Sequence, residues 1–219
     1  MRIEVLVEGA SDEPVVREVL KRHFKLSEQR HFAIHPHRGR GQFPDPSQPQ
    51  QLAHPGLLNQ LGRKLAAYGN SLTSEDWVLV LLDLDDDNCV DLLAQLKQLL
   101  RTLPNKPPNI LFRLAIEETE SWFIADFEAL EAAFPDRPLN KLKQKKIVPD
   151  AIVGAAERLA EHLGTKPALL TGTQKRKWAL QIAPHLNFDS PCSPSFGKFL
   201  SGIENQITLI AAQKPKGKK

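Results

Sequence analysis

Apolar runs alternate with amphipathic segments over the first 135 residues. Short apolar stretches typical of strands lie at residues 2–7, 31–37, 77–82 and 109–116. Apolar positions recur at helical spacing over residues 12–24, 57–68, 88–103 and 117–134. Strands and helices that alternate in this way predict an α/β fold, a mostly parallel four-stranded sheet with helices on both faces.

The pattern changes after Pro135, where no further strand is predicted. Helical segments are expected at residues 139–146, 150–163 and 176–185. We therefore divide the chain into an α/β domain (1–135), a helical C-terminal extension (136–212) and a basic tail (213–219). Residues 38–56 are rich in Pro, Gly and Gln and lack periodicity. They predict a long loop, either an insertion or a functional lid.

Composition and charge narrow the class of protein. The chain has 219 residues, of which 41% are hydrophobic, and no apolar run reaches the ~20 residues of a membrane helix. Its two cysteines suggest no disulfide framework, so a reducing, cytoplasmic location is expected. Residues 1–136 hold 14 Lys/Arg and 21 Asp/Glu, a net charge of −7, whereas residues 137–219 hold 15 and 5, a net charge of +10. This asymmetry predicts cation binding by the first part and nucleic-acid binding by the second, the alternative being solvated surface.

Acidic residues cluster directly after three of the predicted strands. They are Glu8 and Asp12, then Asp83, Asp85, Asp86 and Asp87, and finally Glu117, Glu118 and Glu120. The carboxyl ends of parallel strands meet at one edge of a sheet, so these acids are expected to converge. Helix N-termini favour acids and could account for Asp12 and Glu118. They do not account for Glu8, or for Asp83 and Asp85 after a buried strand, where a cation such as Mg²⁺ would offset the repulsion.

These motifs resemble the Toprim fold of topoisomerases, primases and nucleases. The resemblance lies in Glu8-Gly9 and in Asp83-Leu84-Asp85. Because Asp12 follows Glu8 by four residues, the pattern is more similar to Toprim nucleases of the overcoming-lysogenization-defect type. A family of small, uncharacterised prokaryotic Toprim-like proteins is closer still, and its further motifs are matched by Glu118, Glu120, Trp122, Ala125 and Asp126, by TQKRKWA at 173–179 and by SPSF at 193–196.

The resemblance implies a metal site for phosphoryl transfer. The ligands that it implies for one or two Mg²⁺ or Mn²⁺ ions are Glu8, Asp83, Asp85 and Glu120. The catalytic residues that it implies are Glu8, Asp12 and Lys175, with Asp87, Glu118 and Lys177 as secondary candidates. In this scheme the lysine neutralises the charge of the transition state, and Asp86 is expected to face solvent.

The expected function is that of a metal-dependent nuclease on DNA or RNA, alone or as the effector of a defence or mobile-element system. The chain has no Walker motif, so any ATPase would be a separately encoded partner. The residues expected to contact nucleic acid are Arg38, Arg40, Lys143, Lys145 and Lys146. Two alternatives stay open: a Mg²⁺-dependent phosphohydrolase of a small substrate, and a non-catalytic Toprim-like partner of an ATPase.

Overall fold

Four parallel strands form a single sheet, as the sequence pattern predicts. The computed structural model describes residues 1–45, 47, 53–137, 139 and 148–213. In sheet order the strands are β2 (Phe32–Pro36), β1 (Ile3–Val7), β3 (Trp77–Asp83) and β4 (Ile110–Ala115). Each neighbouring pair is parallel and helices lie between successive strands in the chain, so the predicted α/β fold is confirmed.

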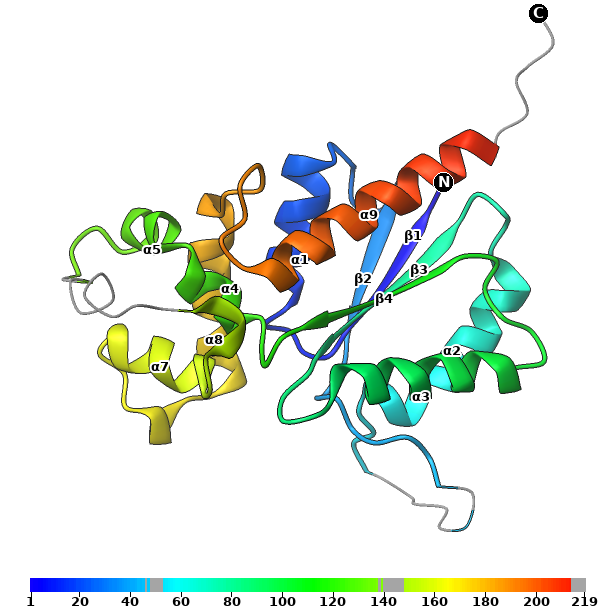
Figure 1. The fold of residues 1–219 in the computed structure, drawn as a ribbon, viewed down its shortest axis with the longest axis horizontal. Helices are drawn as coiled ribbons and strands as arrows, with labels where there is room; N and C mark the ends of the chain where they lie inside the picture. The colour runs from blue at the N-terminus through cyan, green and yellow to red at the C-terminus, as the bar shows by residue number, and fades with distance from the viewer. Residues whose placement is uncertain (46, 48–52, 138, 140–147, 214–219) are drawn as a thin grey trace, which may run out of the picture.

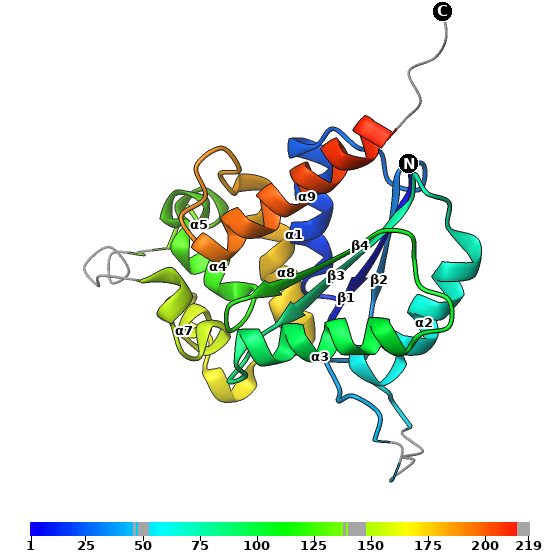
Figure 2. The ribbon, with the colours of Figure 1, turned by 45° about the vertical axis from the view of Figure 1, so that its right-hand side comes forward.

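Helices cover both faces of this sheet (Figures 1 and 2). One face carries α1 (Glu13–Glu18) and α9 (Pro194–Gln213), and the other carries α2 (Leu57–Ser71) and α3 (Cys89–Thr102). Along β3, Leu79 and Leu81 pack with the first pair of helices, and Val78 and Val80 pack with the second pair. Burial on both faces explains why this strand is apolar without alternation.

The order of the strands creates a switch point between β1 and β3. From β1 the chain passes through α1 to β2 on one side, and from β3 it passes through α3 to β4 on the other side. Because α1 and α3 lie on opposite faces, the two connections diverge at the carboxyl ends of β1 and β3. Open α/β sheets bind ligands in the crevice that forms at such a point.

A group of short helices lies beyond the carboxyl ends of the strands (Figure 1). They are α4 (Glu120–Ala125), α5 (Phe127–Ala133), α7 (Ala155–His162) and α8 (Gly172–Ile182), which we call the helical lobe. Short 3-10 turns occur at Pro149–Ala151, Pro167–Leu169 and Ala183–His185, and a π-helical turn at Val19–His23 extends α1. Apolar residues of the lobe and of the sheet face that α1 and α9 cover form one continuous hydrophobic core, separate from the core under α2 and α3.

The helical region differs from its prediction in two places. The helix expected over 117–134 is broken at Asp126, whose carboxylate accepts hydrogen bonds from Ala129 N (3.0 Å) and Asn187 N (2.8 Å). Helix α9 is not expected from the sequence pattern, and it returns to the sheet, where Arg113 Nε donates to Lys198 O (3.0 Å). Apart from Leu139, the helix expected over 139–146 lies outside the described residues, as does nearly all of the basic tail.

Within the described part of the chain, no helix combines the length and the apolar character needed to cross a membrane.

Candidate functional site

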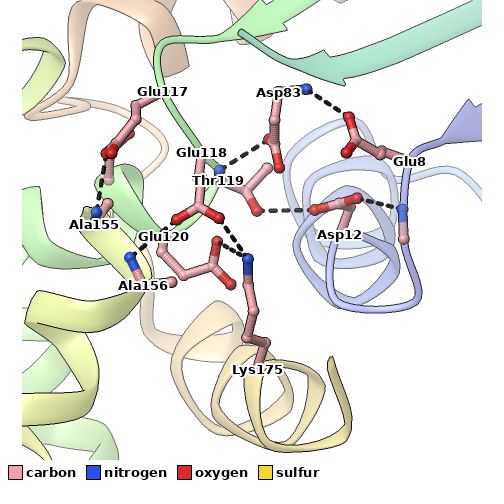
Figure 3. Close-up of polar contacts among 12 residues, drawn as sticks. Glu8, Asp12, Asp83, Glu117, Glu118, Thr119, Glu120, Ala155, Ala156 and Lys175 are labelled. Carbon is pink, nitrogen blue, oxygen red and sulfur yellow. Dashed lines mark hydrogen bonds and ion pairs between the residues drawn. The ribbon is translucent and has the colours of Figure 1, made fainter. Parts of the chain in front are cut away.

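Carboxylates from three strand ends meet at the switch point (Figure 3). Glu8 directly follows β1, Asp83 is the last residue of β3, and Glu120 begins the helix after β4. Glu8 Oε2 accepts a hydrogen bond from Asp83 N at 3.3 Å, so the ends of β1 and β3 are directly joined. The convergence that the sequence predicts for Glu8, Asp83 and Glu120 is therefore present, and Asp12, Glu118 and Lys175 join them.

Thr119 holds two of the buried carboxylates in place. Its hydroxyl donates to Asp12 Oδ1 (2.9 Å), and its backbone N donates to Asp83 Oδ1 (3.1 Å). The other oxygen of Asp12 accepts from Gly9 N (2.8 Å). Both oxygens of Asp12 are thus engaged, which suits a residue that orients the site. Sequence reasoning missed Thr119 because a threonine is not itself an acid or a metal ligand; its place inside the acidic run EETE was the available signal.

Lys175 is the cation inside this cluster. Its Nζ lies 2.8 Å from Glu118 Oε1 and 3.2 Å from Glu120 Oε2. Glu120 is only 1% exposed. Within the described residues neither of its carboxylate oxygens accepts a hydrogen bond, and its contact with Lys175 is an ion pair. The burial of this carboxylate is therefore offset by one ammonium group, which it shares with Glu118.

Burial shifts the pKa values of these groups strongly. It raises the pKa of Glu8 to about 7, and the negative charges of Asp12 and Asp85 act in the same direction. Burial also raises the pKa of Glu120 to about 7, although Lys175 opposes this shift. The pKa of Asp83 rises well above its ordinary value through burial and then through Asp12 and Glu8. Without a further cation, the cluster therefore retains protons near neutral pH.

The remaining acids of the DLDDD run lie at the rim of the cluster. Asp85 has a positive φ of 48° and a side chain that is 47% exposed. Arg40 Nη1 lies 3.4 Å from Asp85 Oδ2 and 2.8 Å from Asp87 Oδ2, and it donates to Leu84 O (3.2 Å). Arg40 therefore fixes this turn, and Asp86 is exposed, as expected.

Glu117 and Glu118 attach the helical lobe to the site. The Glu117 carboxylate accepts hydrogen bonds from Gly154 N and from Ala155 N (3.0 Å), and Glu118 Oε2 accepts from Ala156 N (3.0 Å). These two carboxylates cap the N-terminus of α7, where the helix dipole favours negative charge. The attachment of α7 was not foreseen from the sequence.

The other predicted residues lie apart from the cluster or beyond the described chain. Lys177 is exposed on α8. Arg38 is exposed as well, and its guanidinium contacts His54 Nδ1. The three lysines predicted to contact nucleic acid, Lys143, Lys145 and Lys146, lie outside the described residues.

Oxygen ligands such as these suit Mg²⁺ or Mn²⁺. In the described part of the chain, however, no three His, Cys, Asp or Glu side chains are arranged so as to hold a metal ion. Lys175 already pairs with Glu118 and Glu120, while the hydrogen-bond capacity of Glu120 is unused. The oxygen donors of the cluster are thus of the kind that a divalent ion prefers, but as placed among the described residues they form no three-ligand site, and the cation that Glu118 and Glu120 contact is Lys175.

Comparison with known proteins places the chain in a family. A family model described as Domain of unknown function (DUF4276) matches residues 7–204, so the chain belongs to this family. No significant match was found among curated proteins or solved structures. The matched residues include every described member of the carboxylate cluster, and the predicted membership of an uncharacterised family is confirmed.

Proposed function

We propose that this member of the DUF4276 family is a Toprim-like, metal-dependent phosphodiester hydrolase that acts on DNA or RNA. The observation that carries the proposal is the meeting of Glu8, Asp83 and Glu120 at the switch point, where both carboxylate oxygens of Glu120 are buried without a hydrogen-bond donor. A bound divalent cation would offset the cost of burying this group. The same three residues are ligands by resemblance to Toprim nucleases.

The residues divide into ligands and groups that act on the substrate. Glu8, Asp83 and Glu120 would hold Mg²⁺ or Mn²⁺, with Asp85 available from the rim. When bound, the ion would polarise the scissile phosphate and acidify a water molecule. Hydrolysis joins a water oxygen to phosphorus, breaks the bond to the leaving oxygen and transfers a proton to that oxygen.

Proton transfer and charge stabilisation fall to the chain itself. As an alternative to its role as a ligand, Glu8 would accept the proton of the attacking water, since its carboxylate lies beside Asp83 at the end of β1. Lys175 brings a positive charge to the cluster, oriented by Glu118 and Glu120, which suits the charge that develops on a phosphate in transit. Asp12 acts through Thr119, which also binds Asp83, and is therefore a positioning residue.

A polymeric substrate is favoured by the charge distribution. The net charge of +10 on residues 137–219 suits contact with many phosphates, whereas a small substrate would not need it. The chain would act alone or with a separately encoded ATPase.

The test is a cleavage assay with labelled single- and double-stranded DNA and RNA, in Mn²⁺, in Mg²⁺ and in EDTA. We expect cleavage in the presence of metal and a loss of at least ~100-fold for Asp83→Asn, because removing a ligand costs at least as much as removing a residue behind it. The matched control is Asp86→Asn, which removes an exposed carboxylate from the same run and should cleave like the wild type.

A second candidate, a non-catalytic partner of an ATPase, is favoured by one observation. Lys175 already supplies a cation to Glu118 and Glu120, so the cluster is partly neutralised without metal. Absence of both cleavage and Mn²⁺ binding by calorimetry would select this candidate. Metal-dependent hydrolysis of p-nitrophenyl phosphate with no cleavage of polymers would instead select the small-substrate phosphohydrolase.

A further inference from the structure

A pocket of about 340 Å³ lies beside the end of β2. Four of the residues that line it carry or can carry positive charge, namely His37, Arg38, His54 and Lys64. No Asp or Glu is among the described residues that line it. The charge of the pocket is therefore positive, whereas that of the carboxylate cluster is negative, although both lie at the carboxyl edge of the sheet.

The pocket adjoins that cluster through backbone contacts. His37 N donates to Val7 O (3.1 Å), and Gly39 N donates to Glu8 O (3.0 Å). The segment from His37 to Gly39 therefore runs along the end of β1, which carries Glu8 into the cluster. A substrate bound at Glu8 and a group bound in this pocket would be neighbours on one edge of the sheet.

The cationic groups of the pocket are not neutralised within the described residues. Arg40, two positions away, pairs with Asp85 and Asp87, whereas Arg38 contacts His54 and, in the described chain, pairs with no acid. Lys64 likewise pairs with no acid among the described residues. Burial lowers the pKa of His37, and the positive charge of Lys64 lowers it further.

His37 supplies an additional polar group without a partner. Its Nδ1 lies 2.8 Å from Val7 O, so this nitrogen carries the hydrogen in the hydrogen bond. Its Nε2 is buried and has no hydrogen-bond partner within the described residues. With the hydrogen on Nδ1, Nε2 is an acceptor, which suits a water molecule or a sugar hydroxyl, whereas the charge that would attract a phosphate comes from Arg38 and Lys64.

We propose that this pocket binds a phosphate group of the nucleic-acid substrate, distinct from the phosphate that is cleaved. The inference rests on the proposed function for the identity of the substrate. A guanidinium offers a planar fork for phosphate oxygens, and an ammonium adds a point charge. The volume lies at the lower end of the range of ligand pockets, ~300–1,000 Å³, and suits a phosphate with part of its sugar. Occupation of the pocket would fix the register of the strand relative to Glu8.

The test measures binding without catalysis, by fluorescence anisotropy of labelled single-stranded DNA in EDTA. We expect Arg38→Gln and Lys64→Gln each to raise Kd about 10-fold, as expected for the loss of one charge-assisted contact. The matched control is Arg63→Gln, which removes an exposed charge from the adjacent position of α2 but does not line the pocket. It should change Kd less than ~2-fold, since its exposed charge is screened by salt and does not line the pocket.

Two DNA substrates, one with a 5′-phosphate and one with a 5′-hydroxyl, show whether the pocket binds a terminal phosphate or an internal phosphodiester. Tighter binding of the phosphorylated strand, lost in Arg38→Gln, assigns a terminal phosphate; equal binding with the same loss assigns an internal phosphodiester. Equal Kd values for all three variants and the wild type would overturn the proposal.

A second measurement does not depend on the folding of the variants. In the wild type, titration with inorganic phosphate should shift the imidazole NMR signals of His37 and His54, and unchanged signals for both would also contradict the proposal. Because EDTA abolishes metal-dependent cleavage, the binding measurements are independent of the nuclease assay. A failure of the proposed nuclease activity can therefore be distinguished from a failure of phosphate binding in the pocket.

Discussion

The carboxylates of the cluster are compensated in different ways. Asp12 relies on backbone and hydroxyl donors, Glu118 and Glu120 share Lys175, and Asp85 pairs with Arg40 at the rim. Glu8 accepts one long hydrogen bond, and Glu120 accepts none within the described residues. Glu8 and Glu120 are also the two residues whose pKa rises to about 7. The pKa values of Asp12 and Asp83 are raised as well, although both carboxylates accept hydrogen bonds, so burial is the main cause throughout the cluster.

Metal-free protein should lose stability as these groups ionise. Between the ordinary pKa of Glu8, 4.5, and its folded value of about 7, the folded state keeps a proton that the unfolded state releases. The free energy of unfolding therefore falls as pH rises through this window and stays lower above it. Because one pKa unit corresponds to about 1.4 kcal/mol, Glu8→Gln should be about 1–3 kcal/mol more stable than the wild type at pH 8 and similar to it at pH 4.5.

The measurement is urea denaturation in EDTA at pH 4.5 and pH 8. Comparison with the variant isolates Glu8 from His37, whose lowered pKa acts in the opposite direction. Asp86→Asn is the matched control, and it should stay within about 0.5 kcal/mol of the wild type at both pH values. A constant difference between Glu8→Gln and the wild type would contradict a raised pKa.

Most of the charged cluster is visible in the sequence, because acids placed after strands of a parallel sheet must meet. Glu8, Asp83 and Glu120 follow from this rule, and Lys175 follows only from the family resemblance. The positions of Thr119 and Asp85 do not follow. Thr119 acts through hydrogen bonds between distant segments, and Asp85 lies at the rim because the backbone adopts a positive φ directly after Leu84. Spacing along the chain determines neither feature.

Among the elements, strands were easier to predict than the C-terminal helices. The four strands are short apolar runs with clear ends, and each lies within a few residues of its expected range. Helix α9 contains Gly197 and Gly202, which reduce helix propensity. At Gly202 a Cβ would lie 1.8 Å from Arg113 Nη2, so a larger residue would have to displace this side chain. The sequence shows the glycine but not the close approach of α9 to β4.

The start of α9 depends on a buried hydroxyl. Ser195 is 3% exposed; its Oγ accepts from Trp122 Nε1 (2.8 Å) and donates to Asp150 Oδ1 (3.0 Å). Replacing Ser195 with Ala leaves the buried indole N–H without its acceptor. We expect this change to lower the free energy of unfolding by about 1–3 kcal/mol, measured by urea denaturation.

The matched control for this prediction lies on the same helix. Ser201→Ala removes an exposed hydroxyl whose contact is a 3.4 Å hydrogen bond to Lys198 O, so its effect should stay below about 0.5 kcal/mol. If Ser195→Ala were as mild as Ser201→Ala, the SPSF motif would not be an anchor of α9.

Over the whole molecule, charge is divided along the chain. Four lysines of residues 214–219 contribute to the net charge of +10 on residues 137–219, and +6 remains without them. We expect deletion of residues 214–219 to reduce the slope of log K against log salt for DNA binding, by up to about 3 if all four lysines contact phosphates. Anisotropy at several NaCl concentrations measures this slope. An unchanged slope would show that other residues supply the phosphate contacts.

The Glu118 carboxylate has a consequence for how this region can evolve. One oxygen pairs with Lys175 in α8, and the other accepts a hydrogen bond from Ala156 N at the start of α7. Position 118 thus carries two selective constraints, one electrostatic and one architectural. Glutamine would preserve only the second, and alanine neither. A related protein without the catalytic activity would still need a side-chain oxygen at this position to accept the hydrogen bond from α7.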